Sequence, residues 1–202
     1  MKLYFSPGAC SLSPRIALHE AGILADYDEV DTGSKALKSG GDLRSINPKG
    51  AVPTLELDDG QILTEGPAIV QYIADRRPEA KLAPPADSME RYRLQEWLNY
   101  ISSEVHKTFA PMFSPKATDD TRRAQREVLA PRFDFLNAAL DGKPFLMGEQ
   151  FTVADGYLFT ILNWTIPTGI DLGRWPVLQA YHARVAARPA VRAALTEEGL
   201  IK

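Results

Sequence analysis

The spacing of glycines and prolines changes near residue 77, and this change limits the folds open to the chain more than any other feature. Up to that point, glycines and prolines separate short apolar segments, as in a small unit that mixes strands and helices. From Arg77 to Pro85, prolines crowd a connecting segment, and beyond it the apolar spacing becomes long and helical. We therefore predict a first domain over residues 1–77, a linker over 78–87 and an all-helical domain over 88–202.

The first domain reads as a mixed α/β unit. Short strands are predicted at 2–5, 27–30, 53–57 and 61–63, and helices at 13–21 and 67–75, with room for one more helix before the third strand. Pro14 suits the first turn of a helix and Gly22 its C-terminal cap. Asp58-Asp59-Gly60 separates two apolar segments, which predicts a β-hairpin. This order of elements is that of a thioredoxin-like domain.

The second domain is predicted to be a helical bundle. Ser88 can cap a long helix to about Ala110, and further helices are expected near 119–140, 153–166, 176–187 and 190–197. The candidate core positions of the long helix are Tyr92, Leu94, Trp97, Leu98, Ile101 and Val105. Thr152 and Asp155 have the spacing of a capping box, so Asp155 is expected to stabilise a helix start rather than to act as a catalytic acid.

Composition excludes several classes of function. Lys and Arg total 23 against 26 Asp and Glu, and this net charge of -3 is too small to attract nucleic acid or a membrane surface. A single cysteine excludes an intrachain disulfide, a cysteine-based zinc site and a CxxC redox pair. The motifs of dinucleotide, phosphate-loop and zinc-protease sites are absent, and the three histidines are too dispersed for a metal site. No segment is long and apolar enough for a membrane span or a signal peptide, so a cytoplasmic protein is predicted.

Cys10 lies between the first predicted strand and the first predicted helix. A thiol near a helix N-terminus faces unpaired N–H groups and the positive end of the helix dipole, both of which favour the thiolate. The alternative interpretation is a small buried hydrophobic residue, which is the usual role of a lone cysteine.

Two further segments of the first domain could bind a ligand through the backbone. If the Val52-Pro53 bond is cis, Val52 would offer its N–H and C=O to an extended ligand; otherwise Pro53 is an ordinary turn residue. Gly66 at a helix start could offer its N–H to an anion, and Glu65 could pair with an amine. Equally, Glu65 could only complement the helix dipole.

One polar stripe is predicted on the long helix of the second domain. At 100° per residue, Asn99, Ser103 and His106 fall within about 60° of one another. A solvated helix face more often carries Lys and Glu, so the stripe indicates the wall of a polar cleft, with an ordinary exposed face as the alternative.

Five ordered motifs resemble a known family. These are Pro7-Gly8-Ala9-Cys10-Ser11, the segment 47–53 with 63–66, the segment 96–99 with 104–107, the segment 151–155, and the ending 198–202. Together with the two predicted domains, they make the whole chain similar to the bacterial beta-class glutathione S-transferases. The resemblance implies a homodimer that binds glutathione between its two domains and needs no cofactor or metal.

The resemblance also implies roles for individual residues. Cys10 would lie against the glutathione sulfur and form a mixed disulfide with it, and His106 would lie near the sulfur as a donor or a base. The glutathione backbone and its two ends would be held by Val52, Pro53, Glu65, Gly66 and Lys35 of the first domain. Asn99, Ser103 and Glu104 would contribute from the helical domain, some of them from the partner subunit.

Two positions depart from the family pattern. Phe5 stands where relatives often carry tyrosine, so no hydroxyl there can stabilise a thiolate, and Tyr4 is expected to point to the opposite face of its strand. Gly156 replaces the usual alanine after the capping box, at a helix cost of about 0.5–1 kcal/mol.

The resulting hypothesis is a glutathione transferase that conjugates small hydrophobic electrophiles and exchanges disulfides through Cys10. A glutathione-dependent reductase or dehalogenase of a catabolic pathway is the first alternative. The second is a non-catalytic protein that binds apolar compounds, with Met112, Phe113, Trp164 and Ile166 as candidate lining residues that core packing explains equally well.

Overall fold

The computed structural model describes residues 1–202 and divides into two compact units. The first comprises Met1–Ala83 together with Arg188–Lys202, and the second comprises Pro84–Ala187. The predicted domains placed all of 88–202 in the helical domain, and this is wrong for residues 188–202. Their helix α9 (Pro189–Glu197) packs against α1 (Leu12–Ala21) of the first unit. The ion pair Arg188–Glu20 and the contacts of Arg15 with Glu197 and Glu198 stabilise this arrangement.

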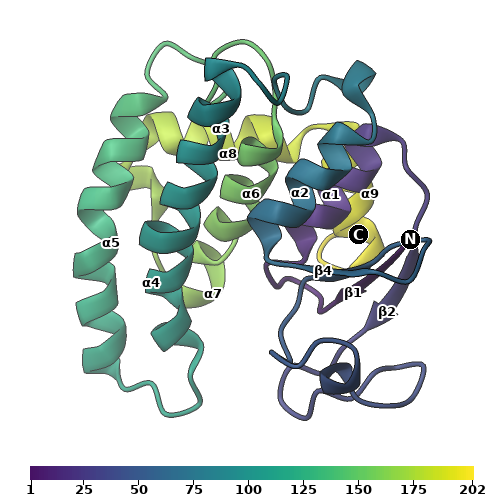
Figure 1. Ribbon diagram of the computed structural model, residues 1–202. Helices are drawn as coiled ribbons and strands as arrows, with labels where there is room; N and C mark the ends of the chain where they lie inside the picture. Colours follow the sequence, from purple (N-terminus) through teal and green to yellow (C-terminus); the bar gives the residue numbers. More distant parts are fainter. The chain divides into compact units, whose positions relative to one another are not determined.

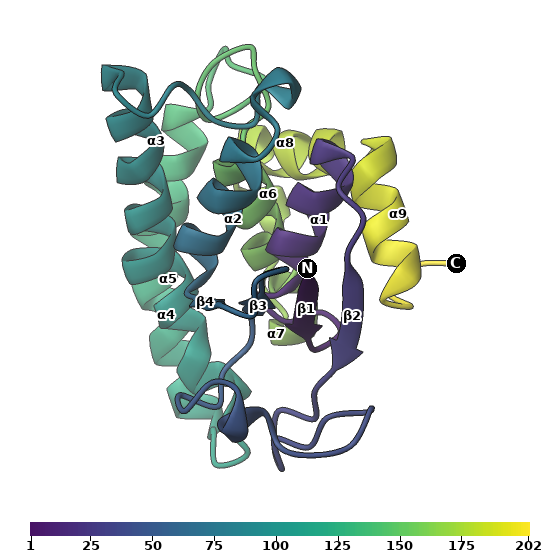
Figure 2. The ribbon, with the colours of Figure 1, turned by 45° about the vertical axis from the view of Figure 1, so that its right-hand side comes forward.

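The first unit is built on a four-stranded mixed sheet of order β2-β1-β3-β4 (Figure 1). Strand β1 (Lys2–Phe5) pairs in parallel with β2 (Asp26–Glu29) and antiparallel with β3 (Thr54–Glu56), which forms a hairpin with β4 (Ile62–Thr64). Helix α1 lies between α9 and α2 (Gly66–Asp75), as Figure 2 shows. The thioredoxin-like topology is therefore confirmed, except that the optional third helix is only the 3-10 turn Leu43–Ser45.

Local sequence signals determine most of these boundaries. Gly22 ends α1 in the left-handed conformation at φ 61°, and Gly60 turns the β3–β4 hairpin at φ 82°. On the sheet, Tyr4 packs with Val30 and Leu43 and donates its hydroxyl proton to Glu56 at 2.7 Å. Phe5 instead lies under the guanidinium of Arg15, which is 4.2 Å from the ring centroid. The two neighbouring rings therefore have different surroundings, in agreement with the expected alternation.

The second unit is entirely helical. Its long elements are α3 (Met89–Tyr100), α5 (Asp119–Ala139), α6 (Val153–Leu162) and α8 (Pro176–Ala186), with the short helices α4 (Lys107–Phe109) and α7 (Thr165–Thr168). Ser88 caps α3 by accepting the N–H of Arg91, as predicted. Leu94, Leu98, Ile101 and Val105 are buried, but Tyr92 is 61% exposed, so its prediction as a core residue is wrong. Tyr92 follows the buried Arg91, one helical position away from the apolar stripe.

The predicted helix over 88–110 is not continuous. After Tyr100 the backbone forms a π-helical turn, Ile101–His106, before α4 and the 3-10 turn Ala110–Phe113. In a π-helical turn the backbone hydrogen bonds join residues five positions apart, instead of four as in an α-helix, and such turns are frequently found at functional sites. The turn therefore changes the positions of Ser103, Glu104 and His106 around the helix axis from those that 100° per residue predicts.

The capping box of α6 is present. One carboxylate oxygen of the fully buried Asp155 accepts the N–H of Thr152 at 2.8 Å, and the other accepts the N–H of Leu146 at 2.8 Å and the hydroxyl of Tyr181 at 3.0 Å. The structural role predicted for Asp155 is thereby confirmed. Gly156 lies inside α6 without interrupting it.

None of the helices combines the length and the hydrophobicity that a membrane span requires.

Candidate functional site

The Cys10 loop, residues 6–11, connects β1 to α1. Hydrogen bonds within the loop and one with a distant residue fix its conformation. Within it, the hydroxyl of the buried Ser11 accepts the N–H of Ser6 at 3.1 Å and donates to the Ser6 carbonyl at 3.2 Å. From outside, the Glu198 carboxylate accepts the N–H of Gly8 at 2.9 Å. Gly8 adopts φ 71°, a left-handed conformation that favours glycine. These contacts fix the loop immediately before α1, where Cys10 lies.

The Cys10 thiol is partly exposed and donates a hydrogen bond to the carbonyl oxygen of Val52 at 3.3 Å. Burial raises the pKa of the Cys10 thiol to about 11, although the N–H groups of Cys10 and Ser11 act in the opposite direction. The two N–H groups are the thiolate-favouring contribution expected of a position before a helix, whereas burial is the contribution expected of a lone cysteine in a core. Desolvation exceeds the effect of the two N–H groups, so Cys10 is a neutral thiol and a donor.

The segment that carries Val52 is shaped by Asn47. The buried Asn47 amide donates to the Ala51 carbonyl at 3.0 Å and to the Thr54 hydroxyl at 2.9 Å, and its oxygen accepts the N–H of Lys49 at 3.1 Å. The Val52-Pro53 bond is cis, as considered from the sequence. The N–H of Val52 makes no hydrogen bond within the chain. Val52 thus has a backbone donor available directly beside the Cys10 thiol.

Glu65 precedes α2 in an unusual backbone conformation. Its φ of 72° and ψ of 115° lie outside the regions that non-glycine residues ordinarily adopt, and the side chain is exposed. Such strain is concentrated at functional sites. The next residue, Gly66, starts the helix, and a methyl group added there would lie 3.9 Å from the Pro53 ring. Glu65 and Gly66 therefore lie on the same side of the unit as the Cys10–Val52 pair.

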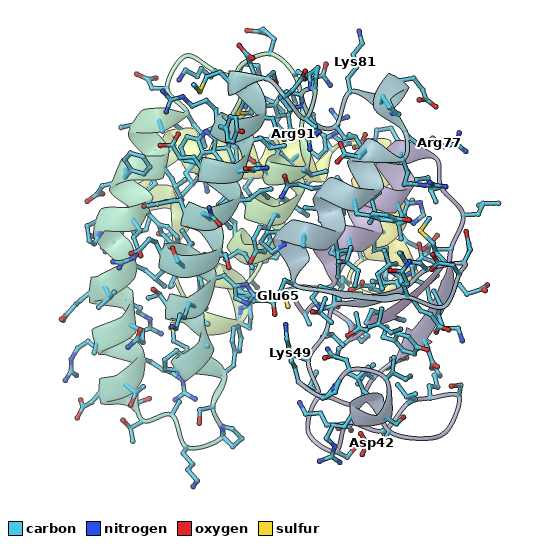
Figure 3. All side chains as sticks on the ribbon, viewed as in Figure 1. Asp42, Lys49, Glu65, Arg77, Lys81 and Arg91 are labelled. Atoms are coloured by element: carbon cyan, nitrogen blue, oxygen red, sulfur yellow. The ribbon has the colours of Figure 1, made fainter.

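Lys49 is a residue that the sequence analysis did not select. Its ammonium group forms an ion pair with the Glu65 carboxylate and lies 3.1 Å from the Thr64 hydroxyl. Figure 3 shows the Lys49 side chain extending toward Glu65. Lys49 lies within the family motif 47–53. A lysine side chain alone does not indicate which carboxylate it pairs with, so its ion pair with Glu65, 16 positions away, could not be predicted.

Lys35 is the third candidate at the edge of the first unit. It also has a positive φ, 70°, and its side chain lies near Gly50 in the segment that carries Val52. Only three non-glycine residues in the structure have a positive φ, and Lys35 and Glu65 are two of them. Both are residues that the family resemblance had selected.

Three candidates of the second unit, Ser103, Glu104 and His106, lie on the π-helical turn, and Asn99 precedes it near the end of α3. Asn99 and Ser103 are exposed, while Glu104 forms an ion pair with Arg132 at 2.7 Å and accepts the Thr108 hydroxyl through its carbonyl oxygen. His106 Nδ1 lies 2.7 Å from the hydroxyl of Tyr157. The Trp164 ring stands edge-to-face against the imidazole, at 4.8 Å between centroids.

His106 is a neutral imidazole at physiological pH. Burial lowers the pKa of His106 to about 4, since no carboxylate compensates for the lost hydration of the charged ring. Tyr157 was not selected from the sequence, although it follows the capping box by two residues. Only the three-dimensional contact identifies it.

An apolar surface lies close to His106 in the second unit. Phe113 is 47% exposed and Ile166 is 75% exposed, and the Phe113 ring packs edge-to-face on Trp164 at 5.3 Å. Met112 is buried and belongs to the core. No group of three or more His, Cys, Asp or Glu side chains is arranged to hold a metal ion.

The fold and these residues define a class: a thioredoxin-like unit with a cysteine before its first helix, joined to an all-helical unit with a partly buried histidine. The family models that match the chain are the glutathione S-transferase N-terminal domain over residues 8–76 and the C-terminal domain over 100–189. The chain therefore belongs to the glutathione S-transferase family.

Individual relatives agree with this assignment over the full length. Glutathione S-transferase GstA of Escherichia coli O157:H7 is 44% identical over 99% of this chain and 100% of its own. A sphingomonad glutathione S-transferase solved with glutathione is 45% identical, with a TM-score of 0.95 over 100% of both chains. The bacterial beta-class enzyme of Sphingomonas chungbukensis is 46% identical, with a TM-score of 0.96 over 100% of both chains. The predicted resemblance to the bacterial beta class is confirmed.

Proposed function

We propose that the protein transfers glutathione to small hydrophobic electrophiles. The observation that carries this proposal is the Cys10 thiol beside the Val52 backbone, in a chain that matches a glutathione-bound relative over its whole length. The Val52 N–H and C=O suit the peptide backbone of a tripeptide, as an added strand would. The exposed carboxylate of Glu65 suits the α-ammonium group, and the N–H of Gly66 at the start of α2 suits the α-carboxylate.

The remaining contacts hold the glycine end and the sulfur of glutathione. Lys35 suits the glycine carboxylate of glutathione, with Pro53 in van der Waals contact below the peptide. Asn99, Ser103 and Glu104 complete the site from the helical unit, and His106 acts near the sulfur. Because Cys10 is a thiol at neutral pH, its S–H can turn from the Val52 carbonyl to the ligand and serve as a donor that stabilises the glutathione thiolate. The glutathione thiol loses its proton to solvent; its thiolate then attacks the electrophilic carbon, and the leaving group departs with the bonding electrons.

The same site supports disulfide exchange. After Cys10 loses its proton, its sulfur attacks the glutathione sulfur of a mixed disulfide, and the other thiol leaves as a thiolate. A second glutathione thiolate then attacks the Cys10–glutathione disulfide, which yields oxidised glutathione and restores the Cys10 thiolate. A reducing cytoplasm suits this chemistry because it supplies reduced glutathione and keeps the thiol free.

Activity measurements on three proteins test the proposal: wild type, Cys10→Ala and His106→Ala. Conjugation of an aryl halide and reduction of a glutathione mixed disulfide are measured in parallel. We expect both activities to fall in the two variants. Equal activity in all three proteins contradicts the mechanism, while a loss confined to disulfide reduction restricts Cys10 to redox chemistry.

A binding function without turnover is the second candidate, favoured by the exposed Phe113 and Ile166 beside Trp164. An apolar surface of this kind recognises size more than chemistry. Tight binding of an apolar dye with no turnover of any electrophile would favour this candidate.

We further propose a homodimer. Phe135 on α5 is exposed, and its ring packs against Tyr100 and Trp97 of α3, with 5.0 and 5.9 Å between ring centroids. An aromatic patch that includes a large exposed side chain is typical of protein interfaces. Sedimentation of Phe135→Glu tests this, because a monomer is expected for the variant and a dimer for the wild type.

A further inference from the structure

Tyr157 is the side chain that forms a hydrogen bond with Nδ1 of the partly buried His106. It lies on α6, is 2% exposed, and its hydroxyl oxygen is 2.7 Å from His106 Nδ1. The two rings stand edge-to-face at 5.9 Å, and Trp164 stands edge-to-face against the imidazole from another position. The imidazole therefore has its plane set by two aromatic neighbours and one nitrogen engaged by a phenol.

The proton on the imidazole can be located by chemistry. The ring is neutral at pH 7, because burial lowers the pKa of His106 to about 4, so it carries a single N–H. A phenol O–H is a stronger acid than a neutral imidazole N–H, and an imidazole nitrogen is a better acceptor than a phenol oxygen. A separation of 2.7 Å is typical of an O–H donor and short for an N–H donor. The phenol therefore donates and Nδ1 accepts.

We propose that Tyr157 is a positioning residue that holds His106 in the tautomer with its proton on Nε2. This rests on the proposed function, in which His106 acts near the glutathione sulfur. With Nδ1 occupied as an acceptor, Nε2 presents a fixed N–H to the site. His106 then donates a hydrogen bond to the developing anion and does not remove a proton from the thiol.

Nuclear magnetic resonance tests the proposal directly on the full-length protein. Long-range 1H–15N spectra of the imidazoles distinguish the two tautomers, and only three histidines are present. The signals of His106 are assigned by their loss in His106→Asn. In the wild type at pH 7 we expect the shift of an unprotonated Nδ1 and a protonated Nε2.

The variant Tyr157→Phe removes one hydroxyl and keeps the ring. We expect the His106 nitrogen shifts to move toward a mixture of tautomers and kcat to fall roughly tenfold, below the usual range for a lost acid–base group. KM for glutathione should stay within about twofold, since the ligand contacts are untouched. Tyr181→Phe is the matched control, because Tyr181 is also buried but donates to Asp155. It should leave the His106 shifts and kcat unchanged.

Three results overturn the proposal: a protonated Nδ1 in the wild type, unchanged His106 shifts in Tyr157→Phe, or changed shifts with wild-type kcat. The wild-type spectrum decides the first of these even if the variant does not fold. Failure of the proposed function has a different signature. In that case His106→Ala retains full transferase activity while the wild-type tautomer is still the one expected.

Discussion

The Sγ atom of Cys10 and the carbonyl oxygen of Val52 are joined by a hydrogen bond of 3.3 Å, in which the thiol is the donor. A thiolate could not make this contact. The pair thus couples the protonation state of the only cysteine to a backbone segment that we assign to ligand binding.

Alkylation of Cys10 should be slow at neutral pH. Burial raises the thiol pKa to about 11, so the thiolate fraction, and with it the rate, should increase tenfold per pH unit from pH 7 to 10. The measurement is the rate of iodoacetamide labelling against pH, with thiolate absorbance at 240 nm as a second readout. Because Cys10 is the only cysteine, Cys10→Ser is a complete blank. A rate that levels off below pH 8 contradicts the expectation.

Glu65→Gln and Lys49→Met should separate ligand binding from stability. Both side chains are more than half exposed, so removing either should change the free energy of unfolding by less than about 1 kcal/mol. Glu65→Gln removes the charge that we assign to the ligand ammonium, and glutathione affinity should fall about 10- to 100-fold. Lys49→Met should change that affinity less than about threefold. Calorimetric titration with glutathione distinguishes the two, and equal losses would show that Lys49 also contacts the ligand.

Asp155→Asn should destabilise the protein by about 2–3 kcal/mol, despite the near-identical shape of the two side chains. Each carboxylate oxygen of Asp155 accepts from donors: Thr152 on one side, Leu146 and Tyr181 on the other. In either orientation, the amide of asparagine directs its own N–H groups at donors. Urea unfolding measures the difference. As a matched control, Asp141→Asn at an exposed position should have a free energy of unfolding within about 0.5 kcal/mol of the wild type.

Glu198 should make stability depend on pH. Burial raises the pKa of Glu198 from 4.5 to about 7, with Arg15 acting in the opposite direction and Glu197 in the same one. The folded state therefore retains a proton that the unfolded state has lost, so stability falls as pH rises from 4.5 to 7. The slope is at most about 1.4 kcal/mol per pH unit. The difference in unfolding free energy between wild type and Glu198→Gln should therefore decrease as pH rises across this range, because the buried Asp155, with its pKa raised to about 6, contributes equally to both proteins. Parallel curves would contradict the expectation.

Local signals made much of the fold predictable. Gly22, the turn at Gly60 and the capping box of Thr152 and Asp155 each act within a few residues, so their consequences appear in the sequence. The π-helical turn Ile101–His106 could not be predicted, because no residue type in it demands a wider hydrogen-bonding step. The packing of α9 on α1 was missed for a related reason. It depends on ion pairs across more than 160 positions, such as Arg188–Glu20.

The candidate site was predictable in its members and less so in its chemistry. Cys10 was placed correctly before the first helix, but the sequence left open whether the helix N-terminus or burial dominates its pKa, since burial cannot be judged from a motif. Glu65 and Lys35 have positive φ values, which cannot be predicted from a glutamate or a lysine in the sequence. Lys49 and Tyr157 entered only through their contacts with Glu65 and His106.

The return of residues 188–202 to the first unit has a consequence for biosynthesis. The loop that carries Cys10 is synthesised long before Glu198, whose carboxylate accepts the Gly8 N–H. The helical unit, Pro84–Ala187, is complete in sequence before the first unit is. Domains usually fold from the N-terminus during synthesis. Here the first unit can be completed only after residues 188–202 have been synthesised, so until then the cysteine loop lacks the carboxylate that accepts the Gly8 N–H.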